Sequence, residues 1–444
     1  MDRAPRLALG HALSARFVAG RAMHGYVGSM KGGDPTHARA QVSGWRIVLI
    51  LLAVMIALPA FVMGAELSFT LGARRAVPAA LLGGAVLGSI AALTGTVGAR
   101  SRKSTYQLIA DAFGMQGAKV ANAVLGFSIL GWYGVIAMML GHALTGVSPV
   151  LAATPVWLLA LAGCVLTTAT TLFGFRALDL LSAITSPLKV ILLVWTFVAA
   201  LRGGMAPVFA FVPAVHANLS TGVSLVAGGL IVGAVLAPDV CRFARTPWHA
   251  AVGAGTAYGL CFPAVLLLAG FPSLAVGNKD LVAIMIILGL GLPALLIVAL
   301  TAWSTNTFNL YAATLVVQTV RPTTLPWKLS LTAGVLGTIL GLAGISNFLV
   351  PYLLWLGICI PPIAGVYLVN AALGGPVEPH RAWRIEALTA WALGSAWAAL
   401  PLSSGWQITP VPALDSMLVC AGAYAVLRKL AAALHAVCRF DQAR

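Results

Sequence analysis

The sequence predicts an all-α polytopic membrane protein, and three observations support that fold class. Hydrophobic residues make up 60% of the 444-residue chain, charged residues make up 9%, and the mean hydropathy is +0.96. A soluble domain of this length needs far more charge to cover its surface. Apolar stretches of about 20 residues, each long enough to span a bilayer, recur from Val48 to Ala432.

Twelve of these stretches are expected to be transmembrane helices. They lie near residues 47–68, 77–98, 117–144, 152–173, 178–201, 221–240, 248–275, 293–318, 327–346, 348–372, 383–401 and 411–435. Residues 281–292 exceed what the eighth span needs, so we expect a short interfacial helix ahead of it. Residues 1–45 form a basic tail, expected to be flexible, without the continuous apolar region of a secretory signal.

The distribution of basic residues orients these spans. The net charge of +16 on its own suggests a nucleic-acid partner, but Lys and Arg are not clustered in one segment. The loops expected outside hold Arg74, Arg75, Arg202 and Lys279, Lys189 lies within a span, and the rest of the 27 basic residues fall in segments expected inside. By the positive-inside rule both termini are cytoplasmic, and the net charge needs no nucleic acid to explain it.

Glycine and proline interrupt the first and sixth expected spans. Span 1 contains Pro59 and Gly64, and span 6 contains a glycine-rich run followed by Pro238. Glycine in membrane helices also serves close packing, but the matched positions of the two segments favour broken helices. These breaks predict a five-plus-five inverted repeat followed by two additional helices: the transport core is 46–375, its repeats are 46–203 and 218–375, and the additional part with its short tail is 376–444.

Hydrogen-bonding side chains cluster inside the eighth span, in TAWSTNTFNLYAA (301–313). On a helix, Thr301, Ser304 and Thr305 share one face because their spacing is i, i+3, i+4. Their oxygens can supply part of the shell of a hard cation such as Na⁺, which carbonyls of a broken helix can complete. The alternative is that these hydroxyls bond to carbonyls of their own helix. Asn306 points elsewhere, and its amide suits a planar amide or heterocycle.

Lys189 lies near the middle of the fifth span, far from either end. A charged residue inside the membrane is costly, so such residues usually face a cavity or a partner and carry function. The alternative is a misplaced span boundary that lets the side chain reach the interface. The position of Lys189 within the span favours the functional interpretation.

Five segments carry a resemblance that covers almost the whole chain after residue 45. They are LGWYGV (130–135), LAPDVCRFAR (236–245), AWSTNTFNLYAA (302–313), FLVPYLLWLGICIPPIAGVYL (348–368) and VPALDSMLV (411–419). Together they resemble the nucleobase–cation symport family, most of all its cytosine-permease-like branch of purine and pyrimidine permeases. The resemblance implies twelve helices with discontinuous helices 1 and 6. It also implies a secondary active transporter of a bacterial inner membrane, which takes up a nucleobase or related planar heterocycle by alternating access, driven by H⁺ or Na⁺.

The resemblance further implies a stacking platform and a cation site. Trp132, in the middle of the third span, would lie under the substrate ring, where stacking on a planar base contributes about 1–3 kcal/mol. Asn306 would lie beside the substrate. The cation ligands would be hydroxyls of span 8 and carbonyls of span 1: Thr301, Ser304, Thr305, Ala60 and Met63.

The chain departs from the family's pattern at three positions. Cytosine-type members carry a polar amide three residues before the span 3 tryptophan, where this chain has Ile129. They carry an aromatic residue in the span 6 break, where this chain has Leu230 after Gly229, and an acidic residue near the end of span 10, where it has Asn370. A pocket lined by Ile129, Gly229 and Leu230 would leave polar edges of cytosine unpaired. A substituted pyrimidine, such as a hydroxymethylpyrimidine, therefore fits better than cytosine.

Lys189 leaves two coupling ions open. In some transporters that resemble this fold, a lysine in helix 5 takes the place of the sodium ion and couples transport to protons. The hydroxyls argue for Na⁺ and the ammonium argues for H⁺, and the two cations would repel each other if both were present. Our hypothesis is that Lys189 faces Thr301, Ser304 and Thr305 and that the coupling ion is H⁺.

Two other classes of function fit the sequence less well. A membrane enzyme acting on lipid-linked substrates usually needs clustered acids or histidines, whereas the 11 acidic residues are scattered, so we expect no enzymatic activity and no cofactor. A channel or non-transporting receptor of the same fold would bind its ligand without accumulating it. The six cysteines have no paired spacing and are interpreted as packing residues. Nothing in the sequence indicates an oligomeric state.

Overall fold

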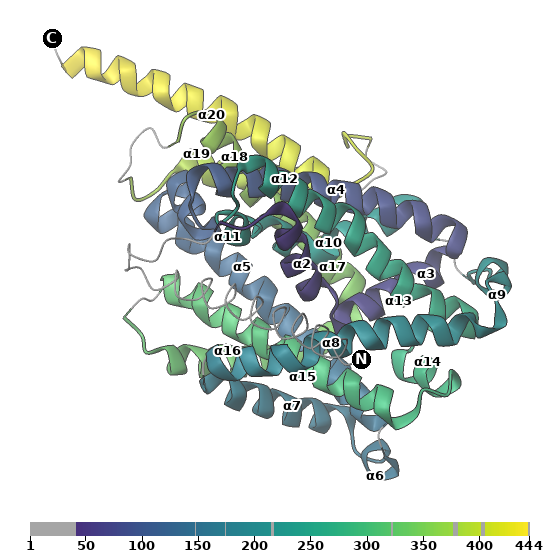
Figure 1. The fold of residues 1–444 in the computed structure, drawn as a ribbon. Helices are drawn as coiled ribbons and strands as arrows, with labels where there is room; N and C mark the ends of the chain where they lie inside the picture. The colour runs from purple at the N-terminus through teal and green to yellow at the C-terminus, as the bar shows by residue number, and fades with distance from the viewer. Residues whose placement is uncertain are drawn as a thin grey trace, which may run out of the picture.

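The computed structural model describes residues 41–146, 148–173, 175–214, 217–320, 323–375, 381–400 and 405–442. The first 40 residues of the expected tail lie outside this part of the chain. Within it the secondary structure is helical, apart from turns and one isolated β-bridge between Val42 and Ala244. Figure 1 shows the helices gathered into one bundle.

Several described helices are suited to a membrane. Among the described residues, seven helical segments are long and apolar enough to cross one: Ala73–Ser101, Thr105–Thr145, Ile184–Gly203, Leu219–Cys241, Pro247–Val276, Gly291–Gln318 and Ile345–Ala372. The expected all-α polytopic membrane fold is thereby confirmed. The other expected spans coincide with a bent helix pair and with α7 (Val156–Leu172), α16 (Pro326–Leu342), α19 (Ile385–Ala398) and α20 (Pro412–Gln442). The count of twelve stays a prediction.

The helices pack into two groups. The first group, whose members contact one another, is α2 (Gly44–Met55), α3 (Leu58–Leu71), α4 (Ala73–Ser101), α10 (Leu219–Val235), α12 (Pro247–Thr256) and α13 (Phe262–Val276). The second is α5 (Thr105–Thr145), α7, α15 (Gly291–Val320) and α16 (Figure 1). Each group draws helices from both halves of the sequence, so the two halves interlock. The boundary between the groups is where polar side chains of both can meet.

Three further helices pack against these groups, and two of them contact both. α8 (Phe175–Ala200) packs against α13 of the first group and α15 of the second. α18 (Pro361–Ala372) packs against α10 and α5, and α17 (Leu349–Cys359) packs against α10. These helices therefore enclose the boundary on more than one side.

The first expected span is broken. α2 and α3 meet at an angle of 78°, and Ile56 and Ala57 between them are not helical. Pro59 stands in the first turn of α3, where its missing N–H costs nothing. Pro59 also cannot donate to the carbonyl of Met55, the last residue of α2, and its ring crowds that carbonyl. The proline therefore ends one helix and starts the next.

The sixth expected span bends without separating. Leu230 has non-helical backbone angles (φ −122°, ψ 17°) inside α10, directly after Gly228 and Gly229. Past Val235 the chain turns and forms the short helix α11 (Pro238–Cys241). The interruption expected in span 6 is thus a kink at Leu230.

The short helix expected over residues 281–292 is present as α14 (Leu281–Ile287). Asp280 precedes it and accepts a hydrogen bond from the backbone N–H of Ala283 at 2.8 Å, which caps the helix. The helix ends where Gly289 and Gly291 adopt positive φ. α14 contacts α3 and α13 of the first group and α5 and α15 of the second.

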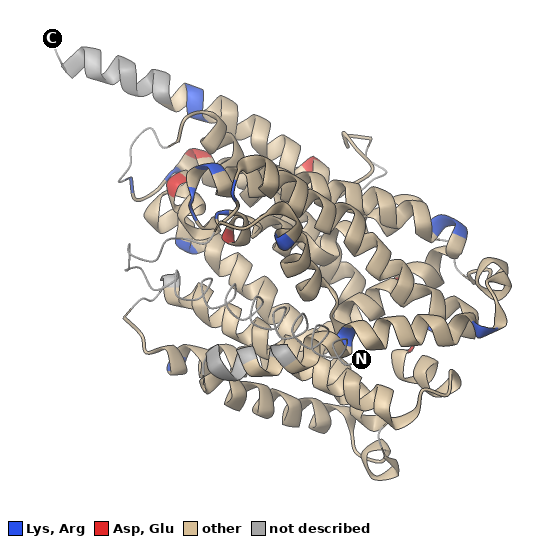
Figure 2. Ribbon diagram, viewed as in Figure 1, with Lys and Arg blue, Asp and Glu red and all other residues tan. Residues whose placement is uncertain are grey.

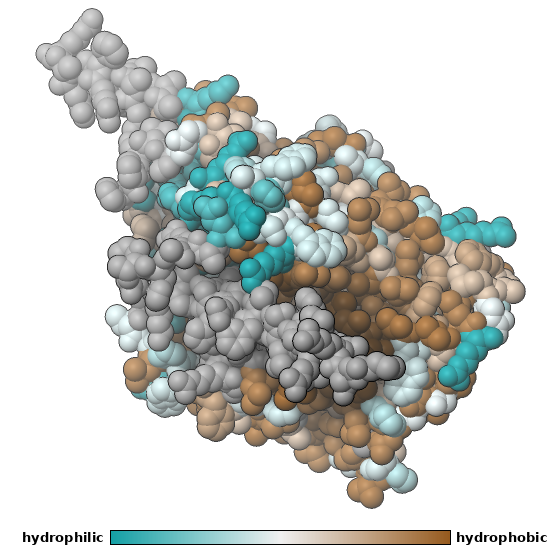
Figure 3. All heavy atoms as spheres, in the orientation of Figure 1, coloured by the Kyte–Doolittle hydropathy of each residue, from teal (hydrophilic) through white to brown (hydrophobic). Residues whose placement is uncertain are grey.

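Charged residues gather at the ends of the bundle. Figure 2 shows most Lys, Arg, Asp and Glu near its two ends, and Figure 3 shows a largely apolar surface between them. At one end, the Asp239 carboxylate of α11 accepts a hydrogen bond from Thr105 N at the start of α5 (2.9 Å). Arg102 donates to the carbonyls of Arg242 (2.8 Å) and Ala244 (2.6 Å). These bonds tie the ends of α4, α5 and α11 together.

A buried arginine joins the additional helix α20 to the transport core. Arg428 donates to the carbonyl and side-chain oxygens of Asn370 (3.2 and 2.9 Å) and to the carbonyls of Leu373 (3.2 Å) and Gly375 (2.5 Å). Tyr424, one turn earlier, donates to the Asn370 side chain at 3.2 Å. A cation at the end of α18 satisfies carbonyls that the helix itself leaves unpaired.

Replacing Arg428 with Met is expected to lower the midpoint of thermal unfolding in detergent by several degrees. The substitution leaves buried carbonyls unpaired, at a cost of about 1–3 kcal/mol. Lys429→Met is the matched control, because Lys429 is the adjacent basic residue and its side chain is exposed. Equal midpoints for the two variants would contradict the assigned role of Arg428.

Candidate functional site

The three hydroxyls expected to share a face of α15 are well inside the bundle. Thr301 and Ser304 are buried and Thr305 is half-buried. The Thr301 hydroxyl donates to the Val298 carbonyl, and the Thr305 hydroxyl donates to the Thr301 carbonyl, each at 2.9 Å. These are the bonds to their own helix that the alternative interpretation described. Donation uses only the hydroxyl hydrogen, so the oxygen lone pairs stay available to a cation or an ammonium.

Ser304 makes a different contact, which leads to the fifth span. The Thr185 hydroxyl of α8 donates to the Ser304 hydroxyl oxygen at 2.8 Å, and both residues are buried. Lys189 follows Thr185 by four residues, which places both on the same face of α8. The Thr185–Ser304 bond therefore turns the face that carries Lys189 toward α15.

The Lys189 side chain is withdrawn from the surface, with 8% of it exposed. The ion pairs in the described part of the chain join Lys103 to Asp111, Lys279 to Glu66 and Arg381 to Glu386, and none of them includes Lys189. A buried ammonium without a carboxylate partner is costly. Such a group is better explained by a role in function than by a role in stability.

The carbonyls of Ala60 and Met63, which are expected to face the cation, lie in helical backbone. Ala60 and Met63 lie inside α3, beyond the break, where backbone carbonyls accept bonds from the next turn. The unpaired carbonyls are instead those at the end of α2, since helix bonding stops at Ile56 N to Leu52 O. Ala60 and Met63 therefore stay predicted cation ligands, but their carbonyls belong to helical rather than unwound backbone. The negative end of the α2 dipole, just before Ile56, offers a better environment for a positive charge.

Asn306 is a buried amide without a partner in the described part of the chain. The residue is 0% exposed, and neither its Nδ2 nor its Oδ1 has a hydrogen-bond partner among the residues that the structure describes. An unsatisfied buried polar group costs about 1–3 kcal/mol, so most such groups in proteins are paired. One donor and one acceptor on a rigid side chain can pair with an amide-like edge of a ligand. Asn306 is therefore the strongest ligand-binding candidate in α15.

Trp132 lies on α5, the helix against which α15 packs. It is half-buried, and its ring makes an edge contact with Tyr352 of α17, with centroids 5.8 Å apart and an interplanar angle of 77°. Ile129, one turn earlier on α5, is buried. A half-buried indole held by a second aromatic ring can act as a stacking surface.

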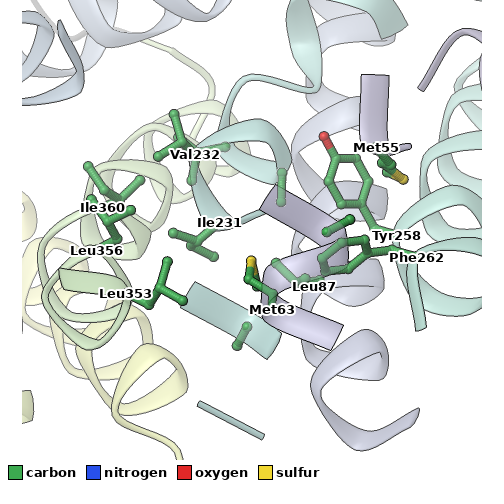
Figure 4. Close-up of a cluster of buried hydrophobic side chains, with 14 of the residues drawn as sticks. Met55, Met63, Leu87, Ile231, Val232, Tyr258, Phe262, Leu353, Leu356 and Ile360 are labelled. Atoms are coloured by element: carbon green, nitrogen blue, oxygen red, sulfur yellow. The ribbon is translucent and has the colours of Figure 1, made fainter. Parts of the chain in front are cut away.

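The kink in α10 packs closely against two other helices. A Cβ atom on Gly229 would overlap the Cε atom of Met63, and a Cβ atom on Gly228 would overlap the carbonyl oxygen of Leu353. Figure 4 shows Met63 next to Ile231 of α10, with Leu353 of α17 on the other side. Met63 therefore reaches the expected site through its side chain, which lies against Gly229.

The two adjacent glycines are expected to differ in their tolerance of alanine. Gly228→Ala should abolish function and lower the yield of folded protein, because the clash is with backbone that cannot move aside. Gly229→Ala should be milder, because the clash is with the end of a flexible side chain. Folded yield and ligand binding of both variants check this expectation. Met63→Ala should restore binding to Gly229→Ala and not to Gly228→Ala.

Two residues of this region, Thr185 and Tyr352, were not among the sequence predictions. The departure from the family's pattern at Asn370 has a structural explanation. Thr185 and Tyr352 contribute through contacts between distant helices. A threonine one turn before Lys189 is the only signal that the sequence offers for Thr185. Asn370 bonds to Arg428 and Tyr424 at the end of α18, so its contacts tie it to α20 rather than to Asn306 or Trp132.

Comparisons with known proteins agree in sequence and in fold. A family model described as "Permease for cytosine/purines, uracil, thiamine, allantoin" matches residues 35–375. The cytosine permease of Escherichia coli strain K12 is 30% identical over 395 residues, which cover 86% of this chain and 91% of that protein. The cytosine permease of Escherichia coli O157:H7 is equally similar over the same length.

Solved structures share the fold at low identity. Mhp1, a nucleobase-cation-symport-1 family transporter, in a closed conformation with bromovinylhydantoin bound, has a TM-score of 0.74 and 17% identity, covering 90% of this chain and 96% of that chain. Its inward-facing conformation has a TM-score of 0.78 and 16% identity, covering 90% and 94%. A Na⁺-coupled sialic acid symporter has a TM-score of 0.63 and 12% identity, covering 93% and 97%.

Proposed function

Because this chain belongs to the family of permeases for cytosine, purines, uracil, thiamine and allantoin, we propose that it takes up a nucleobase or a related planar heterocycle by cation-coupled alternating access. Its relatives are permeases, and the chain is a multi-pass membrane transporter rather than an enzyme. We further place it in a bacterial inner membrane with both termini in the cytoplasm. The observation that carries the proposed substrate class is the buried amide of Asn306, which has no hydrogen-bond partner among the described residues.

The chemistry of the site supports a substituted pyrimidine. Asn306 offers one acceptor and one donor group, which match the amide-like edge of a pyrimidine ring. Trp132 offers a stacking surface, and Ile129 and Leu230 contribute apolar contacts in place of polar or aromatic ones. The relatives named for cytosine and the structure that holds a hydantoin are consistent with a small planar heterocycle. A hydroxymethylpyrimidine fits this combination better than cytosine, because an apolar wall accepts a ring substituent and does not pair with a bare polar edge.

We propose that the coupling ion is H⁺ and that Lys189 carries it. Lys189 lies one turn from the Thr185–Ser304 bond, on the face of α8 that meets α15, and has no ion-pair partner among the described residues. Its ammonium would repel a Na⁺ held by Thr301 and Thr305 nearby. A protonated lysine therefore replaces the sodium ion, and release of its proton empties the cation position.

The arrangement of the helices supports alternating access. The two packed groups can move relative to each other about the boundary where α15, α8 and the break between α2 and α3 lie. A short connection such as Ile56–Ala57 can absorb the change of angle between α2 and α3. The five-plus-five repeat would give the inward and outward states matching sets of contacts.

A thermal-shift screen of the purified protein tests the proposed substrate class. Substituted pyrimidines, hydantoins and thiamine precursors are each added with and without Na⁺. A ligand at 100 times its Kd stabilises the folded state by about 2.7 kcal/mol, so a true substrate raises the unfolding midpoint. We expect substituted pyrimidines to do so equally with and without Na⁺. A response to none of these heterocycles would contradict the proposal.

A further inference from the structure

Tyr352 of α17 makes two contacts with the helical turn that carries Trp132. Its ring packs edge-on against the Trp132 indole, with centroids 5.8 Å apart. Its hydroxyl donates a hydrogen bond to the carbonyl oxygen of Ser128. That carbonyl is the one to which the N–H of Trp132 is directed in an α-helix. One side chain thus fixes both the backbone turn and the ring of the stacking surface.

The sequence next to Trp132 makes room for this contact. A Cβ atom on Gly131 would lie 2.6 Å from the Tyr352 hydroxyl oxygen and 2.8 Å from two of its ring carbons. Real Cβ atoms do not approach that closely, so any side chain at position 131 would displace the tyrosine. Glycine at this position therefore lets the tyrosine ring lie beside the indole.

The residue after Tyr352 holds α17 against the other wall of the site. The carbonyl oxygen of Leu353 lies where a Cβ atom on Gly228 would stand, so α17 and the kinked part of α10 are in backbone contact. Leu353, Leu356 and Ile360 pack with Ile231 of α10 in the same cluster (Figure 4). The backbone of α17 is thus held between the Trp132 turn and the α10 kink.

From these contacts we infer that Tyr352 is the residue that restricts the site to single-ring heterocycles, an inference that rests on the proposed function. Its ring occupies one flank of the Trp132 indole, so a stacked ligand has only the remaining area. A pyrimidine needs less of that area than a bicyclic purine. Tyr352 also positions the indole, through its bond to the Ser128 carbonyl.

The test compares the ratio of dissociation constants for a purine and a pyrimidine, adenine and 5-hydroxymethylcytosine, in purified full-length variants. Tyr352→Leu removes the ring and should lower the purine-to-pyrimidine Kd ratio at least tenfold. Tyr352→Phe keeps the ring and should leave the ratio within twofold while weakening both ligands several-fold. Trp355→Leu is the control, because Trp355 lies on the same helix with 68% of its surface exposed. A purely structural residue would change stability and leave the ratio untouched.

The outcomes separate this inference from the function on which it rests. Pyrimidine binding by the wild type together with an unchanged ratio in Tyr352→Leu overturns the inference and leaves the proposed function standing. Binding of neither heterocycle by the wild type overturns both. If Tyr352→Leu does not fold, Gly131→Ala tests the same point, because its methyl group displaces the tyrosine ring from the indole. Gly131→Ala should then lower the ratio, and an unchanged ratio in that variant likewise overturns the inference.

Discussion

Replacing Asn306 with Leu is expected to have opposite effects on ligand binding and on stability. The amide is buried and has no partner among the described residues, so a substrate that pairs with it would lose both hydrogen bonds, each worth about 0.5–1.5 kcal/mol. Unpaired polar atoms left on the ligand add to that loss. We expect affinity for the pyrimidine substrate to fall by about 10- to 100-fold, since about 1.4 kcal/mol is a factor of ten.

The ligand-free variant should be at least as stable as the wild type. Leu is close to Asn in shape and removes a buried polar group that no described residue satisfies. Calorimetric titration measures the affinity, and the unfolding midpoint without ligand measures the stability. Asn309→Leu is the control, because Asn309 is half-buried on the same helix. A variant with unchanged affinity and a lower midpoint would show that Asn306 is structural.

Replacing Lys189 with Met is expected to abolish accumulation of substrate while some exchange remains. The methionine side chain fills the same space and cannot carry a proton, so substrate movement is no longer linked to the pH gradient. In proteoliposomes with an acidic exterior, the wild type should concentrate labelled substrate and the variant should only equilibrate it. Counterflow, in which unlabelled internal substrate exchanges for labelled external substrate, should persist in the variant.

Two other variants serve as comparisons for Lys189→Met. Lys279→Met removes an exposed lysine of the loop before α14 and should leave accumulation close to that of the wild type. Thr185→Val, which removes the bond to Ser304, should impair accumulation less than Lys189→Met. Unimpaired concentrative uptake by Lys189→Met would show that this lysine does not couple transport to protons.

Much of the fold follows from the sequence because each membrane helix must satisfy its own backbone groups. The apolar segments coincide with helices, and α14 follows from an apolar run longer than one span requires. The break in span 1 follows from Pro59, which cannot continue a helix. The family and the permease class also follow from short segments spread along the chain.

The position of the break was less predictable, because span 1 contains two helix-breaking residues, Pro59 and Gly64. Pro59 has no N–H to bond to the Met55 carbonyl and its ring crowds that carbonyl, so the chain unwinds at Ile56 and Ala57 and not near Met63. Gly64 stays helical, and a Cβ atom there would overlap the carbonyl oxygen of Leu266 on α13. It is a packing glycine, as the alternative interpretation of such residues held. We therefore propose that the end of α2 supplies carbonyls to the cation position.

Contacts between helices that are distant in the chain could not be predicted from the sequence. Thr185 and Ser304 are 119 residues apart, and the hydroxyl of Tyr352 reaches a carbonyl 224 residues away. Helical spacing shows which residues share a face but not which other helix that face meets. The hydroxyl cluster of α15 was therefore found from the sequence, whereas the residue that contacts it was not.

Uptake driven by one ion gradient at a time tests the central proposal most directly. Wild-type protein in sealed proteoliposomes receives a labelled substituted pyrimidine, either with an inward H⁺ gradient in Na⁺-free buffer or with an inward Na⁺ gradient at equal pH. We predict accumulation above the external concentration with the H⁺ gradient alone. Strict dependence on Na⁺ with no response to the pH gradient would contradict coupling through Lys189, and binding without accumulation under either gradient would contradict active transport.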